Sequence, residues 1–204
     1  GHTVDYKGKR CALRLLPAGF INAGTRLLLA AGTLINPDIL FQEIELCKVD
    51  PSRVGIDYNA GIVTDMDSEQ EILLQLRKRI GSTLSGTGFA VARRALRNDN
   101  FRLARDMPEL RPLLTCVSEE VNKALDSNKK VLIEGTQGYG LSLYHSGCYP
   151  FTTSRDTIAS AFLSEVGMSP FQANSIIMVI RTFPIRVAGN SGPLPSEISW
   201  KKIQ

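Results

Sequence analysis

Hydrophobic residues in the first third of the chain fall into short runs that are separated by turns. Cys11–Leu16 and Arg26–Ala31 flank the segment PAGFINAGT, which is rich in proline and glycine. Apolar runs bounded by such residues are typical of buried strands. We therefore predict two strands here, and two shorter ones at Val54–Tyr58 and Ile62–Thr64.

Segments with helical spacing of apolar residues alternate with these strands. Asn36-Pro37 is predicted to begin a helix that ends near Lys48, since asparagine is a good N-cap and proline is tolerated at the first helical position. The segment Asp67–Ile80 has acidic residues in its first turn and basic residues at its end, as the helix dipole favours. Its apolar side is expected to consist of Ile72, Leu73, Leu76 and Ile80.

The second half of the chain continues the alternation. We expect helices at Leu110–Leu125 and Thr157–Val166, and a strand at Lys130–Ile133 between them. Pro170–Ile180 begins with helical spacing and then becomes rich in β-branched residues, so helix and strand both stay open. Strands alternating with helices predict an α/β protein with a largely parallel central sheet flanked by helices.

Composition narrows the class of ligand. Hydrophobic residues make up 43% of the 204 residues and charged residues 22%, which is ordinary for a globular core. A net charge of +4 suits an anionic small ligand. This charge is lower than the dense positive charge of a nucleic-acid-binding surface. The basic segment Arg93–Arg105 also has few aromatic residues that could stack on bases. We therefore expect no nucleic-acid partner.

Two further patterns bear on location. No apolar run approaches the ~20 residues of a membrane span, and the N-terminus lacks the order of a signal peptide, so we expect a cytoplasmic protein and no membrane partner. The cysteines show no C-x-x-C spacing, which argues against a zinc site or a disulfide framework. We expect reduced thiols at Cys11, Cys47, Cys116 and Cys148.

Two glycine-rich stretches could bring the backbone close to a ligand. These are GSTLSGTG, Gly81–Gly88, and GTQGYG, Gly135–Gly140. Neither matches a standard nucleotide fingerprint, so spacing alone favours ordinary surface turns. Nearby hydroxyl groups, including those of Thr152–Ser154, and guanidinium groups are the usual equipment for holding a phosphate monoester. The arginines are Arg93, Arg94, Arg97, Arg102 and Arg105, of which we expect most to lie on a solvated face.

Five segments resemble one known family in the same order. VLIEGTQG and YPFTTS resemble the E-G-[AT]-Q-G and Y-P-[FY]-x-T-S motifs of adenylosuccinate synthetases. The opening GHT with LRLLPAGF, then AAGTLINPDILFQEI, GSTLSGTG…ARR and IRVAGNSGPLPSEI resemble further family segments. LSLYHSGCYP and the short loop after Gly88 are similar to the compact archaeal and phage branch, part of which accepts dGMP in place of IMP.

The resemblance also shows what we expect to lie outside this chain. The family's N-terminal phosphate loop, with its catalytic aspartate, would precede Gly1, and its aspartate and guanine-binding segments would follow Gln204. The resemblance implies that residues 1–204 are the central part of a single domain, related in fold to P-loop NTPases. A ligase completed by these other parts is the preferred hypothesis. A non-catalytic nucleotide-binding remnant is the alternative.

The resemblance implies a reaction and two catalytic residues. Enzymes of this family transfer the γ-phosphoryl group of GTP to O6 of IMP in the presence of Mg²⁺, and L-aspartate then displaces that phosphate to give adenylosuccinate. ATP as the donor stays open. By the motif match, His2 would stabilise charge on the phosphate bridge and Gln137 would hold the purine edge through its amide.

The resemblance further implies how the nucleotide phosphate is bound. Ser82, Thr83 and Thr153 would donate hydrogen bonds to it. Arg93 would reach it from the neighbouring subunit of a homodimer, and Arg94 is the alternative because the short loop leaves the register open.

The other implied contacts involve the ends of the chain. Val187 and Gly189 would pass close to the ribose, and the Gly1 carbonyl would lie near the metal. His145 has no counterpart in the family and is expected to be structural.

Overall fold

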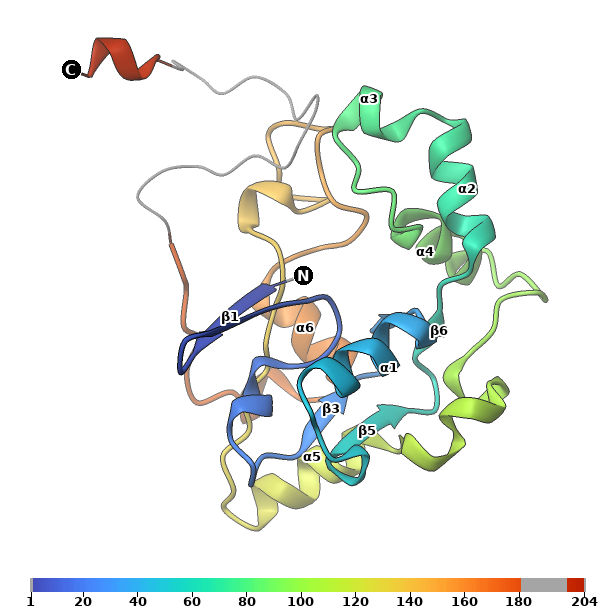
Figure 1. Cartoon of the computed structure of the whole chain (residues 1–204), viewed down its shortest axis with the longest axis vertical. Helices are drawn as coiled ribbons and strands as arrows, with labels where there is room; N and C mark the ends of the chain where they lie inside the picture. The colour runs from blue at the N-terminus through green and yellow to red at the C-terminus, as the bar shows by residue number, and fades with distance from the viewer. Residues whose placement is uncertain (1, 181–197, 204) are drawn as a thin grey trace.

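The strands form three small sheets in this computed structural model, which describes residues 2–180 and 198–203 (Figure 1). β1 and β2 pair as an antiparallel hairpin, whereas the order β3-β5-β7 is a parallel sheet and β4-β6 a parallel pair. The strands of the described residues are β1 (His2–Tyr6), β2 (Lys9–Leu13), β3 (Leu27–Leu29), β4 (Leu34–Ile35), β5 (Val54–Asp57), β6 (Gly61–Ile62) and β7 (Leu114–Thr115).

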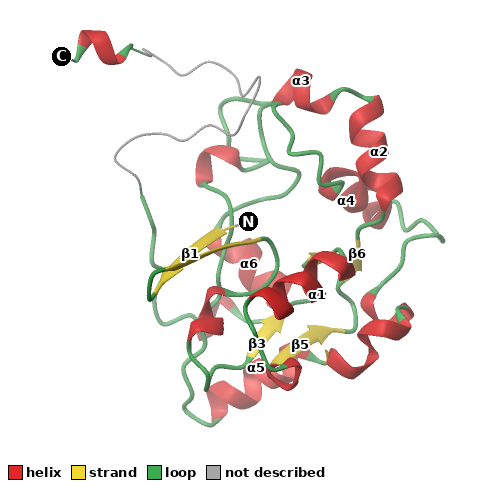
Figure 2. Cartoon of the chain, viewed as in Figure 1, coloured by secondary structure: helices red, strands yellow, loops and turns green. Residues whose placement is uncertain are grey.

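Helices are interspersed with these strands along the chain, and Figure 2 shows the two kinds of element in different colours. The α-helices of the described residues are α1 (Pro37–Leu46), α2 (Asp65–Leu73), α3 (Leu76–Ile80), α4 (Thr87–Ala95), α5 (Val117–Asp126) and α6 (Ala159–Val166). Short 3₁₀ helices are η1 (Ala18–Ile21), η2 (Pro51–Arg53), η3 (Ala104–Asp106), η4 (Pro108–Leu113), η5 (Tyr139–Leu141), η6 (Pro170–Gln172) and η7 (Trp200–Lys202). The predicted α/β class with a largely parallel sheet is confirmed.

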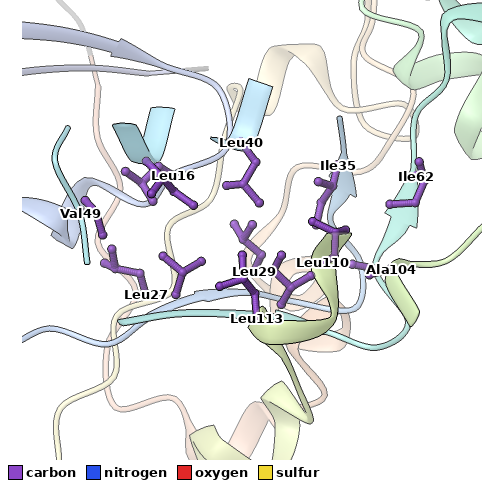
Figure 3. Close-up of a cluster of buried hydrophobic side chains, with 14 of the residues drawn as sticks. Leu16, Leu27, Leu29, Ile35, Leu40, Val49, Ile62, Ala104, Leu110 and Leu113 are labelled. Carbon is purple, nitrogen blue, oxygen red and sulfur yellow. The ribbon is translucent and has the colours of Figure 1, made fainter. Parts of the chain in front are cut away.

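The parallel sheet lies between two hydrophobic clusters. Leu27 and Leu29 of β3 belong to the larger cluster, which α1 covers (Figure 3). Leu28, between them, packs with Ala30 against the smaller cluster formed by α5 and α6. Successive side chains of a strand point to opposite faces, so burial on both sides explains why this strand is apolar at every position.

The start of α1 confirms the prediction for Asn36-Pro37. The Asn36 side chain accepts a hydrogen bond of 3.1 Å from the Ile39 amide, and Pro37 is the first helical residue. Further along, Glu43 is buried, and its carboxylate accepts hydrogen bonds from the amides of the turn after β2. Those amides belong to Arg14 (2.6 Å), Leu15 (3.0 Å) and Leu16 (2.8 Å).

The predicted helix Asp67–Ile80 is wrong in its length and in its buried face. The helix is interrupted at Gln75, which adopts a left-handed conformation with φ of 51°, so that α2 and α3 are separate helices. Ile72 and Leu73 are exposed, at 56% and 70%, whereas Asp67 and Glu71 are buried. The periodicity of apolar residues identified the helix, but the face that packs on α4 is acidic because it binds polar groups.

Three predictions for the second half of the chain need correction. Leu110–Leu125 is the 3₁₀ helix η4, then β7, and only then α5. Lys130–Ile133 is not a strand: Val131 and Ile133 pack on the smaller cluster, but no described strand pairs with this segment. Pro170–Ile180 contains only η6 as regular structure. The helix predicted at Thr157–Val166 is confirmed as α6.

Two further expectations can be compared with the structure. All four cysteines lie within the described residues and are free thiols. Among the described helices, none has the length and apolar character that crossing a bilayer requires.

The Glu43 contacts predict a specific loss of stability. Glu43→Gln keeps the size of the side chain but replaces one acceptor oxygen with an NH₂ group, leaving at least one of the three amides without a partner. We expect the free energy of unfolding to fall by about 1–3 kcal/mol, measured by urea denaturation. Glu45→Gln, at an exposed position of the same helix, is the control and should leave stability unchanged. Equal stability of the two variants would contradict the assigned role.

Candidate functional site

The buried side of α2 holds two carboxylates that face α4 and the loop before it. Asp67 is 1% exposed and completes a capping box with Thr64, whose amide and hydroxyl donate to its Oδ2 at 2.8 and 2.9 Å. Glu71 lies one turn further along the helix and is also buried. Buried carboxylates require hydrogen-bonded partners, and both have them.

Asp67 binds Arg93 of α4 in a two-pronged ion pair. The Nε–Oδ1 distance is 2.7 Å and the Nη2–Oδ2 distance is 2.8 Å. Nη1 donates to the Asn100 carbonyl at 3.4 Å, and the guanidinium lies 5.3 Å from the centre of the Phe101 ring. Arg93 is therefore engaged within its own chain, and the role predicted for it in a neighbouring subunit stays a prediction.

Glu71 binds both ends of the loop that joins α3 to α4. Its Oε2 accepts from the Ser82 hydroxyl at 3.0 Å, and its Oε1 accepts from the Gly88 amide at 3.2 Å. Within the loop, the Thr83 hydroxyl donates to Ser85 Oγ at 3.2 Å. At Gly86, with φ of 74°, a Cβ atom would lie 2.8 Å from the Asp67 side chain, so the close approach of α4 to α2 requires glycine.

The second glycine-rich loop continues into a compact arrangement around Ser142. The Ser142 hydroxyl is fully buried and donates to Asp156 Oδ1 at 2.7 Å, which lowers the pKa of that carboxyl. The Thr153 amide donates to the Leu141 carbonyl at 2.8 Å, which places Thr153 beside the end of the loop Gly135–Gly140. These bonds fold the segment back on itself without a strand or a long helix.

The two loops meet at Gly88 and Ser154. A Cβ atom on Gly88 would lie 3.7 Å from the Cβ of Ser154, so the start of α4 contacts the segment that carries Thr153. The hydroxyl-bearing loops that the sequence singled out separately are neighbours in the fold.

One tight turn anchors both loops. Arg94 of α4 donates to the Ala31 carbonyl and to the Asn59 carbonyl, each at 2.9 Å. Arg155, from the other loop, donates to the Gly32 carbonyl at 2.6 Å. A Cβ atom on Gly32 would lie 2.3 Å from the Glu165 side chain, so only glycine fits there.

Glu165 of α6 completes this anchor. Its carboxylate lies 3.4 Å from Arg155 Nη1, and its backbone carbonyl accepts from the Gly32 amide at 3.2 Å. Burial raises the pKa of the Glu165 carboxyl, and the positive charges of Arg155 and Arg94 act in the opposite direction. No sequence pattern predicted this group, since Gly32 and Glu165 are far apart along the chain.

Gln137 combines an unusual backbone with a free side chain. Its φ of 72° is left-handed, which is uncommon for a residue other than glycine. It is exposed, and its amide makes no hydrogen bond to any residue that the structure describes. Backbone strain of this kind tends to occur at functional sites.

His2 lies next to the glutamate of the same loop. Its Nε2 is buried, 3.9 Å from Glu134 Oε1, and has no hydrogen-bond partner among the described residues. The other oxygen of Glu134 accepts from the Ala18 amide at 2.8 Å, which directs the carboxylate. The fold thus brings the opening segment of the chain to the EGTQG loop. Glu134 was not among the predicted site residues, although Glu134 stands in the same EGTQG motif as Gln137.

The structure provides fewer contacts for the remaining candidate residues. His145 stacks on Tyr139, with ring centres 5.8 Å apart, and its Nε2 lies 3.9 Å from Asp156 Oδ2. Gly1, Val187 and Gly189 lie outside the described residues. Within residues 2–180 and 198–203, no group of three or more histidine, cysteine, aspartate or glutamate side chains forms a metal-binding cluster.

A parallel sheet with helices packed on both of its faces, and glycine-containing loops beside it, defines the α/β class of protein. The sequence matches the model of the adenylosuccinate synthetase family over residues 1–107 and 101–204. The chain therefore belongs to the adenylosuccinate synthetase family.

Individual relatives agree with this assignment. The chain is 46% identical to adenylosuccinate synthetase of Thermococcus sibiricus over 207 residues, covering 100% of this chain and 60% of that protein. It is 43% identical to that of Methanocaldococcus jannaschii, covering 100% and 59%. The chain thus spans about 60% of the length of these curated relatives.

Two solved structures share the fold. Fully ligated adenylosuccinate synthetase from Plasmodium falciparum matches with a TM-score of 0.74 and 25% identity, over 85% of this chain and 51% of that one. The cyanophage S-2L succinoaminodeoxyadenylate synthetase PurZ, bound to dGMP and to dATP as an energy donor, matches with a TM-score of 0.70 and 28% identity, over 83% and 49%.

The Asp67–Arg93 pair predicts a structural effect at an arginine that is also a candidate ligand. Lysine keeps the charge of Arg93 but cannot form the two-pronged contact. Arg93→Lys should lower the free energy of unfolding by about 1–3 kcal/mol, measured by urea denaturation. Arg97→Lys, at an exposed position beyond the end of α4, should have no effect. Unchanged stability of Arg93→Lys combined with weaker nucleotide binding would instead favour the role in a neighbouring subunit.

Proposed function

We propose that this chain is part of a purine-nucleotide ligase that joins L-aspartate to IMP, giving adenylosuccinate in purine nucleotide biosynthesis. Family membership supports this proposal. The structural observation that carries it is the contact between Gly88 and Ser154, which brings the loop Gly81–Gly88 to the segment that carries Thr153. Gln137 lies in the preceding glycine-rich loop, and its amide has no hydrogen-bond partner among the described residues. The reaction is a phosphoryl transfer to O6 of the purine, followed by displacement of that phosphate by the amino group of aspartate.

The chemistry assigned to this chain is to hold the purine and stabilise the charge that develops on it. The Gln137 amide both donates and accepts, so it suits the edge of a purine ring. His2 acts on the phosphate bridge as a hydrogen-bond donor or general acid. Its Nε2 has no hydrogen-bond partner among the described residues, but it is buried, so the imidazole would have to turn to make that contact.

The phosphate of the nucleotide would lie between the two loops. Thr83 from the loop before α4, with Ser82 shaping that loop or binding directly, and Thr153 from the other loop supply hydroxyl groups. Arg93, or Arg94 as the alternative, would reach the phosphate of the neighbouring subunit in a homodimer. Since both guanidinium groups have partners within the chain, either would have to exchange those bonds for the phosphate.

The remaining contacts rest on the motif match alone. Val187 and Gly189 would line the ribose, and the Gly1 carbonyl would lie near Mg²⁺. The described residues do not form a metal site by themselves. Mg²⁺ commonly keeps several waters and binds substrate phosphates, where it neutralises charge during phosphoryl transfer. We infer that this chain is the central part of a single domain. We also infer that the protein is cytoplasmic.

The choice of nucleotides gives a second candidate function. IMP with GTP is the proposed pair, with ATP as the alternative donor. The fold shared with PurZ, which was bound to dGMP and dATP, favours a dGMP-using variant as the runner-up. A non-catalytic nucleotide-binding remnant is the remaining alternative. Binding titrations with IMP, GMP and dGMP distinguish the first two, since a clear preference for dGMP would move the function to 2-aminoadenine nucleotide synthesis.

The ligase proposal predicts a strict dependence on substrates. The intact protein, supplied with IMP, L-aspartate, GTP and Mg²⁺, should release inorganic phosphate and form a succinyl nucleotide. Leaving out aspartate should abolish formation of the succinyl product, and leaving out IMP should abolish phosphate release above background. Phosphate release that is the same with and without a purine monophosphate would refute the ligase proposal. Binding of nucleotide with no turnover would support the remnant.

Gln137 provides a test at a single residue. In Gln137→Ala the purine edge loses a partner in a desolvated site, which should cost about 1–3 kcal/mol of transition-state stabilisation. That loss is equivalent to a fall in kcat/KM of about 5- to 150-fold. Since Gln137 has no partner within the described chain, the melting temperature should not fall. Thr136→Ala, at the adjacent position, is the matched control. Unchanged kinetics of Gln137→Ala would mean that this amide does not contact the purine.

A further inference from the structure

Glu71 has no part in the function proposed above, although it contacts the loop that would bind the nucleotide phosphate. It is 3% exposed, and each of its carboxylate oxygens accepts one hydrogen bond from that loop, from Ser82 and from Gly88. We propose that Glu71 is a positioning residue that fixes the conformation of the phosphate-binding loop Gly81–Gly88. This inference rests on the proposed function, because it concerns the same phosphate site.

The hydrogen bonds of Ser82 show how Glu71 constrains the rest of the loop. The single hydroxyl hydrogen of Ser82 is donated to Glu71 Oε2, and its oxygen accepts from the Leu84 amide at 3.1 Å. The Ser82 amide is also used, since it donates to the Leu76 carbonyl at 3.3 Å. A phosphate oxygen only accepts hydrogen bonds, so Ser82 has no donor left for it. Ser82 therefore shapes the loop, and the ligand role passes to its neighbours.

The loop that results is strained, and two of its amides have no partner among the described residues. Leu84 adopts a left-handed conformation with φ of 59°, which a branched side chain rarely adopts. The chain of bonds from Glu71 through Ser82 to the Leu84 amide opposes relaxation of that conformation. The amides of Thr83 and Ser85, on either side of Leu84, donate to no described residue. The Leu84 amide between them is occupied by Ser82 Oγ, so the two amides that remain alternate along the turn, where both can face one anion.

Glu71 acts through other residues and does not touch the nucleotide. A carboxylate only accepts hydrogen bonds when ionised, and both of its oxygens are already occupied by donors of the loop. A direct contact with phosphate would also bring like charges together. The second bond, to the Gly88 amide in the first turn of α4, fixes the helix relative to the loop. Glu71 thus holds the loop at both ends.

Two conservative variants of the intact protein test this assignment. Glu71→Gln keeps the shape of the side chain but cannot accept from both Ser82 and Gly88 without rearrangement, and Ser82→Ala removes only the hydroxyl. Each should raise the KM for IMP by about tenfold, equivalent to ~1.4 kcal/mol, with kcat and the KM for aspartate unchanged. The double variant should be no worse than the poorer single variant, since both remove the same bond. Glu69→Gln, at an exposed acidic position of α2, should behave as wild type.

A second measurement does not depend on catalysis. Amide hydrogen exchange in the peptide that spans residues 81–88, followed by mass spectrometry without nucleotide, should be faster in Glu71→Gln and Ser82→Ala than in wild type and Glu69→Gln. Wild-type exchange in Glu71→Gln would overturn the inference. A lower kcat at unchanged KM, together with a lower melting temperature, would also overturn it, because that pattern indicates a merely structural role.

These outcomes separate the two proposals. If the wild-type protein neither binds IMP nor releases phosphate, the proposed function fails, and hydrogen exchange still decides whether Glu71 fixes the loop. If the wild-type protein is an active ligase but both variants keep its KM for IMP, the proposed function stands and the positioning role fails.

Discussion

Buried backbone groups in irregular loops need hydrogen-bond partners, and in this protein charged side chains supply them. The strands in the described part of the chain are two to five residues long, so hydrogen bonds between strands satisfy few of these groups. Glu43 binds three consecutive amides, and Asp57 accepts from the amide of Val117 at the start of α5 at 3.0 Å. Arg94 and Arg155 bind carbonyl groups in the same way. The loop conformations, and with them the candidate site, depend on these contacts.

This constraint explains why some elements could be predicted from the sequence and others could not. The start of α1 was predictable because its signals, Asn36 and Pro37, are local. Lys130–Ile133 was predicted as a strand because it is short and apolar, but strand formation also requires a neighbouring strand to pair with, which no local pattern reveals. Its apolar side chains are explained equally well by packing on the smaller cluster.

The residues of the candidate site also divide into those that could be predicted from the sequence and those that could not. The motif match identified His2 and Gln137, and the fold places both in or beside the EGTQG loop. The pattern of apolar residues assigned the helix a buried face that contains Ile72 and Leu73, whereas the structure buries Asp67 and Glu71. Their spacing of four residues, shortly before a glycine-rich loop that needs donors and acceptors fixed, was the available signal. A hydrophobicity count does not detect it, because the buried carboxylates are stabilised by partners distant in sequence.

The shared anchor at Ala31 and Gly32 has a consequence for how a ligand would be bound. Arg94 and Arg155 attach the two loops to one tight turn, and Gly32 leaves no room for that turn to carry a side chain. Immobilising either loop also restricts the turn, so part of the conformational entropy of the second loop is lost before that loop makes any contact. Different portions of a single nucleotide, each held by one loop, would then favour one another's binding without any movement of the sheet.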